Sequence, residues 1–233
     1  MEICVIHGSN RKGNTDRTID IIKDKLNSFE EINYSDIYLH RDLPHFCNGC
    51  FSCLETGTFA GENCPHKEYT NIILEKLLKS DGIIIGSPSY ALSETAQIKS
   101  LFDHLACTYL CHRPNEEMFK KIGLVVSTAA GAGTKNVIAS VSRNFLFWGV
   151  NRVIKCGINM WEVDWDKIPD KKRIRFEKLL KSKAGLFYRK IKKRYKLSRN
   201  FKTAFLWFFF KKLIKSYSDT NPDKIYWKAK GWI

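Results

Sequence analysis

The sequence predicts an α/β protein built on a doubly wound, five-stranded parallel sheet, and three observations carry this prediction. Apolar runs of strand length alternate with segments of helical spacing over the first 165 residues. The segment 81–90 holds a short, wholly apolar run that ends in turn residues, as strands buried on both faces do. Loops of small and polar residues follow several of the runs. This order is typical of β–α units around a parallel sheet.

The five strands are expected in order along the chain, at residues 3–6, 32–39, within 81–90, 122–127 and 152–160. The intervening helices are expected after residue 15 and over about 66–79, 94–110 and 136–148. The loop from 43 to 65 exceeds 20 residues, which is too long for a plain connection and indicates a functional insert.

Size and composition limit the kind of protein this is. A chain of 233 residues can bury a full core. No segment has the roughly 18–20 uncharged apolar residues that a membrane span needs, and the first residues lack the pattern of a signal peptide. We therefore expect a cytoplasmic protein whose eight cysteines are thiols or metal ligands rather than disulfides.

The net charge of +15 is distributed very unevenly. Residues 170–233 hold 21 Lys and Arg against 4 Asp and Glu, whereas residues 1–169 are close to neutral. We therefore expect two parts, a main domain over 1–165 and a basic, amphipathic C-terminal extension over 166–233.

The segment that follows the first strand, residues 8–15, has the character of an anion site. It leads directly into a helix, whose first N–H groups are unpaired and whose dipole favours a negative charge, so a phosphate is the usual ligand. The glycine spacing matches neither common nucleotide loop. Side chains must then contribute, and the candidates are Ser9, Asn14, Thr15 and either Arg11 or Lys12. The alternative is an ordinary polar turn.

Three loops at predicted strand ends carry small or hydrogen-bonding residues: 8–15, 87–92 and 128–134. In doubly wound sheets, ligands lie beyond the carboxyl ends of the strands. Pro88 fixes one turn, and Gly131 and Gly133 allow the backbone to approach a ligand closely. Together the three loops predict a nucleotide-like ligand that spans all of them.

Four sequence blocks match a known family in order and spacing: GSNRKGNT at 8–15, CNGCFSC at 47–53, GSPSY at 86–90 and KSLFD at 99–103. Over residues 3–160 the chain resembles the flavodoxin-like NAD(P)H-dependent FMN reductases and the related iron–sulfur flavoproteins. The resemblance implies a flavodoxin-like, FMN-binding domain over 1–165 and a homodimer. It also implies an FMN-dependent NAD(P)H oxidoreductase that acts on a flavin, quinone or similar small acceptor.

The resemblance also implies which residues bind FMN. The phosphate would be held by Ser9, Arg11, Asn14 and Thr15. The ribityl chain and the ring edge would be lined by Pro88, Ser89, Tyr90 and Leu92, and the polar end of the ring by the loop Thr128 to Gly133, which includes Gly131. The family often has Asn or a small polar residue after Tyr90, where this chain has Ala91 and Leu92. No catalytic side chain is implied, because the flavin carries the chemistry.

The long loop carries a second candidate site. Cys47, Cys50 and Cys53 form C-x2-C-x2-C, and Cys64 follows after ten residues, a spacing that can hold a [4Fe–4S] cluster. Zinc held by the same thiols, or with His45 or His66 replacing one of them, is an alternative, and metal-free thiols are another. With a cluster, the protein would relay single electrons from a ferredoxin-type partner to FMN.

The extension includes residues 201–214, in which aromatic residues are flanked by lysines. This is the make-up of an interfacial membrane helix, so contact with a membrane surface is one interpretation. The alternative is that the aromatic face packs on the main domain or on a second subunit. Charge alone favours nucleic acid, and we expect no such partner. Three functions therefore compete: an enzyme, an electron relay and a non-catalytic binding module that keeps the fold.

Overall fold

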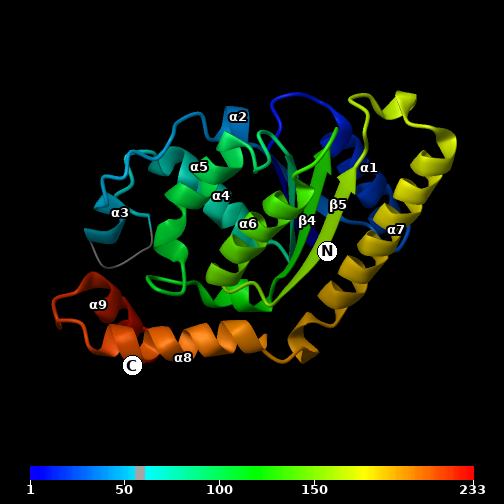
Figure 1. The fold of residues 1–233 in the computed structure, drawn as a ribbon. Coiled ribbons are helices and arrows are strands. Elements are labelled where there is room, and N and C mark those ends of the chain that lie inside the picture. The colour runs from blue at the N-terminus through cyan, green and yellow to red at the C-terminus, as the bar shows by residue number, and fades with distance from the viewer. Residues whose placement is uncertain (56–60) are drawn as a thin grey trace.

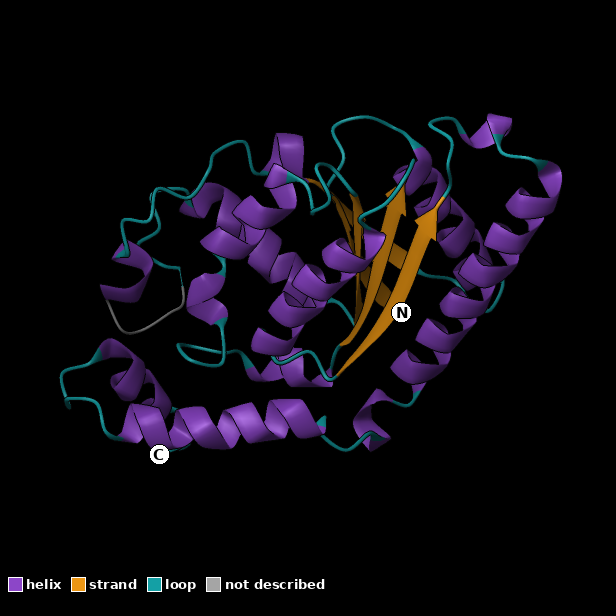
Figure 2. Ribbon diagram, viewed as in Figure 1, coloured by secondary structure: helices purple, strands orange, loops and turns teal. Residues whose placement is uncertain are grey.

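The computed structural model describes residues 1–55 and 61–233. Its centre is a five-stranded sheet in the order β2-β1-β3-β4-β5, in which every neighbouring pair is parallel (Figures 1 and 2). The strands are β1 Glu2–His7, β2 Asn33–Tyr38, β3 Gly82–Pro88, β4 Ile122–Ala129 and β5 Arg152–Asn159. This confirms the predicted doubly wound, flavodoxin-like architecture.

Helices cover both faces of the sheet (Figure 2). They are α1 Asn14–Asn27, α2 Leu39–Asp42, α3 Ser52–Glu55, α4 Lys67–Lys79, α5 Ala96–His104, α6 Thr134–Phe147, α7 Asp170–Lys192, α8 Phe201–Lys215 and α9 Pro222–Ala229. Short 3-10 turns lie at Ala106–Thr108, Glu116–Lys120, Trp165–Lys167 and Arg194–Lys196. The helix expected over 94–110 is shorter than predicted, because α5 ends at His104 and a 3-10 turn follows.

The two faces of the sheet have separate cores, and α7 belongs to one of them. Alternate residues of β1 enter opposite cores, Ile3 on the side of α1 and Cys4 on the side of α4 and α5. Phe187 and Ile191 of α7 are fully buried on the α1 side. A Cβ atom at Gly82 would come within 2.6 Å of both, so this glycine allows α7 to pack directly on the strand.

The predicted extension over 166–233 therefore contributes to two different cores. α7 covers the sheet, while α8 and α9 form a third cluster in which Phe210, Ile214 and Trp227 pack against Leu110. The division at residue 165 remains a prediction. We propose that α7 be counted with the sheet domain, and only α8 and α9 as the extension.

A buried arginine joins the C-terminal helices to the cysteine loop. Arg113 is 1% exposed, and its Nε donates to Oδ1 of Asp223 in α9 at 3.1 Å. Its two terminal nitrogens donate to the carbonyl oxygens of Cys53 and Leu54 in α3, at 3.1 and 2.5 Å. The indole of Trp227 donates to the carbonyl of His112 at 2.6 Å. The position of α9 and that of α3 thus depend on the same side chain.

Candidate functional site

The loops after the strands meet at the carboxyl edge of the sheet and enclose a hollow of about 220 Å³. It is lined by Ser9, Arg11, Gly13, Asn14, Thr15, Pro88, Ser89, Tyr90, Thr128, Ala129, Ala130, Glu162 and Val163. Eight of the eleven residues implied for FMN binding therefore lie around one hollow. Leu92, Gly131 and Gly133 do not line it.

The loop after β1 is ordered by its own polar groups. The Ser9 hydroxyl donates to the Arg11 carbonyl at 2.8 Å. Gly13 is the N-cap of α1 and offers no side-chain acceptor to the N–H groups of the first turn. The hydroxyls of Thr15 and Thr128 are hydrogen-bonded at 2.7 Å, which connects α1 to the end of β4. The helix start is therefore held against the hollow with its N–H groups suited to an anion.

The loop after β3 contains a tight turn with an unusual composition. Tyr90 and Ser93 exchange two backbone hydrogen bonds, at 3.0 and 3.1 Å. The two residues between them, Ala91 and Leu92, have φ of +48° and +66°. These are the features of a type I′ turn, which normally takes Asn-Gly because both positions need positive φ. Ala91 and Leu92, which depart from the family pattern, therefore occupy the two turn positions that require positive φ.

Gly133 packs the loop after β4 against this turn. Its φ is +106°, and a Cβ atom there would lie 2.1 Å from the Ser89 hydroxyl and 2.9 Å from Cα of Leu92. The Asn136 side chain also donates to the Leu92 carbonyl at 3.0 Å. Gly133 thus brings two site loops together rather than facing the ligand. Gly131 has open space around its Cβ position.

The residues around the hollow fit FMN. The Ser89 hydroxyl is buried against Gly133 and has no hydrogen-bond partner within the described part of the chain, and rotation of this side chain would bring it to a polar ligand group. The start of α1, with Arg11 beside it, suits a phosphate. Pro88 and the half-exposed Tyr90 supply apolar and aromatic surface. The hollow therefore offers suitable groups for the phosphate, the ribityl chain and the ring of FMN.

His7 was not predicted as part of the site, although it supports the first loop. Its two ring nitrogens bond carboxylates of Asp16 and Asp36, each at 2.8 Å, and Lys23 bonds Asp36 at 2.6 Å. Burial lowers the pKa of His7, but the two carboxylates raise it more, so the net pKa is raised. Asp16 also accepts from the Gly13 N–H at 3.2 Å, so His7 helps to fix the start of α1.

Glu162 and Val163 were also missed. They line the hollow from the loop after β5. The rule that placed the other three loops would have found them, because β5 ends at the same edge of the sheet.

The four cysteines of the long loop line a second hollow. Cys47 and Cys50 are exposed, Cys53 is half-buried and Cys64 is buried. His66 and His104 line the same hollow. The sequence grouping of the four cysteines thus corresponds to a spatial one, and the donor set suits thiolate-bound iron–sulfur clusters as well as zinc.

Two of these thiols are predisposed to ionise. The pKa of Cys53 is lowered because Cys107 donates a hydrogen bond to it, and the nearby Arg113 charge adds to this effect. The pKa of Cys50 is lowered by hydrogen bonds from Ser52. Burial raises the pKa of Cys64. Because the thiolate is the form that binds metal, Cys50 and Cys53 are suited to be ligands.

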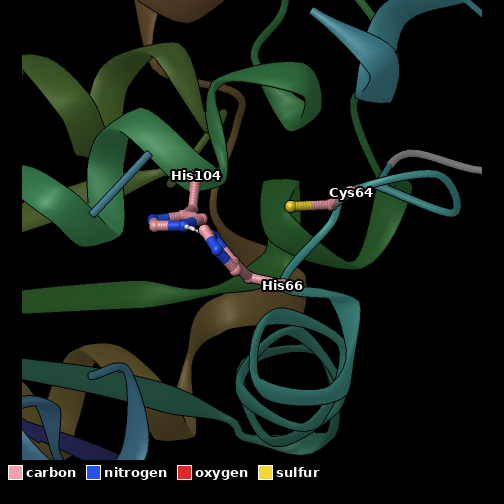
Figure 3. A group of neighbouring side chains, drawn as sticks. All are labelled: Cys64, His66 and His104. Carbon is pink, nitrogen blue, oxygen red and sulfur yellow. Dashed lines mark hydrogen bonds between the residues drawn. The ribbon is translucent and has the colours of Figure 1, made fainter. Parts of the chain in front are cut away.

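His104 was not anticipated from the sequence. It ends α5 and is 38 residues from His66, yet the two rings are hydrogen-bonded, Nδ1 of His66 to Nε2 of His104, at 3.0 Å (Figure 3). His45 stacks on His66 with ring centroids 4.8 Å apart. Burial lowers the pKa of His104. No local pattern could have indicated this pairing, because it depends on tertiary packing.

The C-terminal helices leave one aromatic surface open. α8 buries Thr203, Phe210 and Ile214, and its Trp207 stacks on Trp227 with centroids 4.6 Å apart. Its other side exposes large side chains at Phe201, Phe205, Phe208, Phe209 and Leu213. No helix in the described ranges is long and apolar enough to span a membrane.

The comparisons with known proteins agree with this geometry. The family described as NADPH-dependent FMN reductase matches residues 1–163. An iron–sulfur flavoprotein of Methanocaldococcus jannaschii is 32% identical over 151 residues, which cover 63% of this chain and 72% of that protein. One from Archaeoglobus fulgidus is 29% identical over 153 residues, covering 64% of each chain. The match thus spans less than two thirds of the Archaeoglobus protein.

A solved structure supports the fold. An FMN-dependent NADH-azoreductase from Bacillus anthracis, in complex with FMN, superposes with a TM-score of 0.62 at 13% identity. The superposition covers 81% of this chain and all of that one.

Proposed function

Because the chain belongs to the family of NADPH-dependent FMN reductases, we propose that it is an FMN-dependent NAD(P)H oxidoreductase acting on a flavin, quinone or similar small acceptor. The observation that carries the proposal is that the loops after β1, β3 and β4 together line one hollow, and that this lining includes Ser89. FMN bound there would supply the hydride and electron chemistry.

The residues of the chain would bind FMN and orient it. The N–H groups at the start of α1 and the charge of Arg11 hold the phosphate. Ser89 would hydrogen-bond the polar chain of the cofactor, and Pro88, whose φ is fixed by its ring, would keep that loop in one conformation. Tyr90, 49% exposed at the mouth, offers an aromatic face to the ring or to an incoming substrate.

The test is FMN loading followed by steady-state turnover. We expect the full-length protein to bind FMN and to oxidise NADH or NADPH when a model quinone is present. A folded protein that cannot be loaded with FMN would contradict the proposal. The homodimer expected from the resemblance is tested by light scattering on the same sample.

A second candidate is an electron relay, and the four cysteines around one hollow favour it. Cys47, Cys50, Cys53 and Cys64 would hold a [4Fe–4S] cluster, which would supply one-electron chemistry. Anaerobic purification with iron and sulfide assays distinguishes it from the first candidate. About four irons per chain, with reduction by a ferredoxin and not by NAD(P)H, would establish the relay.

We further propose that the outer face of α8 contacts an anionic membrane surface. Phe201, Phe205 and Phe209 are exposed at helical spacing on one side. The sequence from 178 to 218 contains many Lys and Arg and no Asp or Glu. An aromatic face flanked by basic residues binds anionic lipid interfaces.

The membrane proposal is tested with F205S/F209S in the full-length protein. We expect the double variant to lose binding to vesicles that contain anionic lipid. Ile72→Ser, at a similarly exposed position on α4, is the matched control and should bind like the parent. Equal binding by the double variant would refute the proposal.

A further inference from the structure

Three metal-ligand side chains meet where the cysteine loop reaches the end of α5. One donor atom each from Cys64, His66 and His104 lies within 4.8 Å of the other two. Figure 3 shows the Cys64 sulfur directed toward the paired imidazoles. Cys64 and His104 are buried, and His66 is partly buried. The donors come from two elements that are far apart in the sequence, α5 and the segment just before α4.

The protons of the pair can be assigned from the hydrogen bonds. Nδ1 of His104 lies 2.8 Å from the Ser100 carbonyl, which can only accept, so Nδ1 carries the proton. Nε2 of neutral His104 therefore presents a lone pair toward Nδ1 of His66. A ring nitrogen fixed to a backbone carbonyl is the usual second-shell arrangement of metal-binding histidines. His104 is thus already in the tautomer that a metal requires.

The spacing suits one small divalent ion. Two zinc–nitrogen bonds of about 2.0–2.1 Å at a tetrahedral angle place the nitrogens about 3.3 Å apart. The two nitrogens of His66 and His104 are 3.0 Å apart, so they need to separate only slightly. A zinc–sulfur bond of about 2.3 Å would require the Cys64 sulfur to lie about 3.6 Å from each nitrogen.

We propose that Cys64, His66 and His104 bind one zinc-type divalent ion, with its fourth position open to the hollow lined by the other cysteines. The ion takes the place of the proton that Nδ1 of His66 donates to His104, this proton moves to Nε2 of His66 by exchange with solvent, and binding releases the thiol proton of Cys64 to solvent. This site does not depend on the flavin chemistry. It is incompatible with a cluster that uses Cys64, because one thiolate cannot serve both.

The bound ion would cross-link the chain. Cys64 and His66 directly precede α4, and His104 ends α5. An ion between them fixes the end of the cysteine loop to the helical layer. We therefore expect zinc to stabilise the folded protein by mass action.

The experiment uses full-length protein stripped with a chelator and then titrated with Co²⁺ and Zn²⁺. We expect one ion per chain, with a thiolate-to-cobalt charge-transfer band and the visible bands of tetrahedral cobalt. Cys64→Ser should remove the charge-transfer band. His104→Gln and His66→Gln should each weaken binding by more than the roughly 10–100-fold that the loss of an outer-shell partner costs.

Cys111→Ser is the matched control, because Cys111 is a partly exposed thiol that does not line this hollow. It should bind Co²⁺ and Zn²⁺ like the parent. His66 is only partly buried, so His66→Gln still tests the site if substitution of the buried His104 prevents folding. The thermal midpoint of each metal-free variant shows whether it folds. The proposal is overturned if both histidine variants retain parental affinity. It is equally overturned if Cys111→Ser abolishes binding, or if anaerobically purified protein carries iron and sulfide that depend on Cys64.

Discussion

Replacing Ala91-Leu92 by Asn-Gly is expected to stabilise the protein, although it removes an apolar side chain. Both residues lie at positive φ in the turn between Tyr90 and Ser93. An L-residue in the left-handed region costs roughly 1–2 kcal/mol, so relieving two such positions yields roughly 2–4 kcal/mol. The glycine lowers this gain by about 0.5–1 kcal/mol, because it has more conformational freedom to lose on folding. Leu92 is 58% exposed, so little burial is lost.

The expected net gain is therefore about 1–3 kcal/mol. For a chain of this size, each kcal/mol shifts the thermal midpoint by about 2–4 °C, so the midpoint should rise by roughly 2–12 °C. The assay is thermal and urea unfolding of the FMN-free protein, followed by far-UV circular dichroism. Leu92→Ala is the matched control, because it shortens the side chain and keeps the same backbone strain.

Two results would refute this reasoning. If Leu92→Ala stabilises the protein as much as the Asn-Gly pair, the gain comes from the side chain and not from the backbone. If the pair is no more stable than the parent, the turn is not of type I′ in solution. FMN affinity, measured on the same samples, shows whether the native pair serves the ligand at the expense of stability.

Three further predictions concern charged residues. Arg11→Ala should weaken FMN binding about 10–100-fold, the value of a hydrogen bond to a charged group, and fluorescence titration measures it; unchanged affinity would place the phosphate elsewhere. Asp223→Ala should lower the unfolding free energy by about 3–5 kcal/mol in urea, because it removes the carboxylate that pairs with the buried guanidinium of Arg113. A smaller loss would mean that solvent reaches Arg113. Burial lowers the pKa of His112, but the hydrogen bonds and charges of Asp223 and Cys111 raise it more, to about 10. The folded state therefore holds this proton more tightly than the unfolded state, so its stabilisation is complete below about pH 6.5 and is lost as pH rises toward 10. His112→Gln should flatten that part of the stability–pH profile.

The sheet and the loops that line the first hollow could be predicted because their signals are local. Strand runs, helical spacing and strand-end loops each fall within a few residues of sequence. The placement of α7 in the extension stays a prediction, and it follows from the many charges that surround a narrow apolar stripe, Leu180, Phe187 and Ile191. That this stripe packs on the sheet becomes clear only from the structure, in which Phe187 and Ile191 lie against Gly82 of β3.

The contacts that could not be predicted are long-range and polar. Arg113 and Asp223 are 110 residues apart, and His66 and His104 are 38 apart. Neither pair has a periodicity or a motif, since each depends on how separate elements pack. The strained turn at Ala91 was visible only as a departure from a pattern, because φ angles cannot be read from residue names.

The side chain of Arg113 makes two distant events depend on each other. It must pair with Asp223 of α9 and hold the carbonyls of Cys53 and Leu54 at once. A ligand that binds more tightly when the carbonyls of Cys53 and Leu54 are held would therefore favour docking of α9, and undocking of α9 would weaken that ligand by the same factor. Occupancy of the cysteine hollow and docking of α9 would then be reciprocally coupled equilibria, with one guanidinium group as the physical connection.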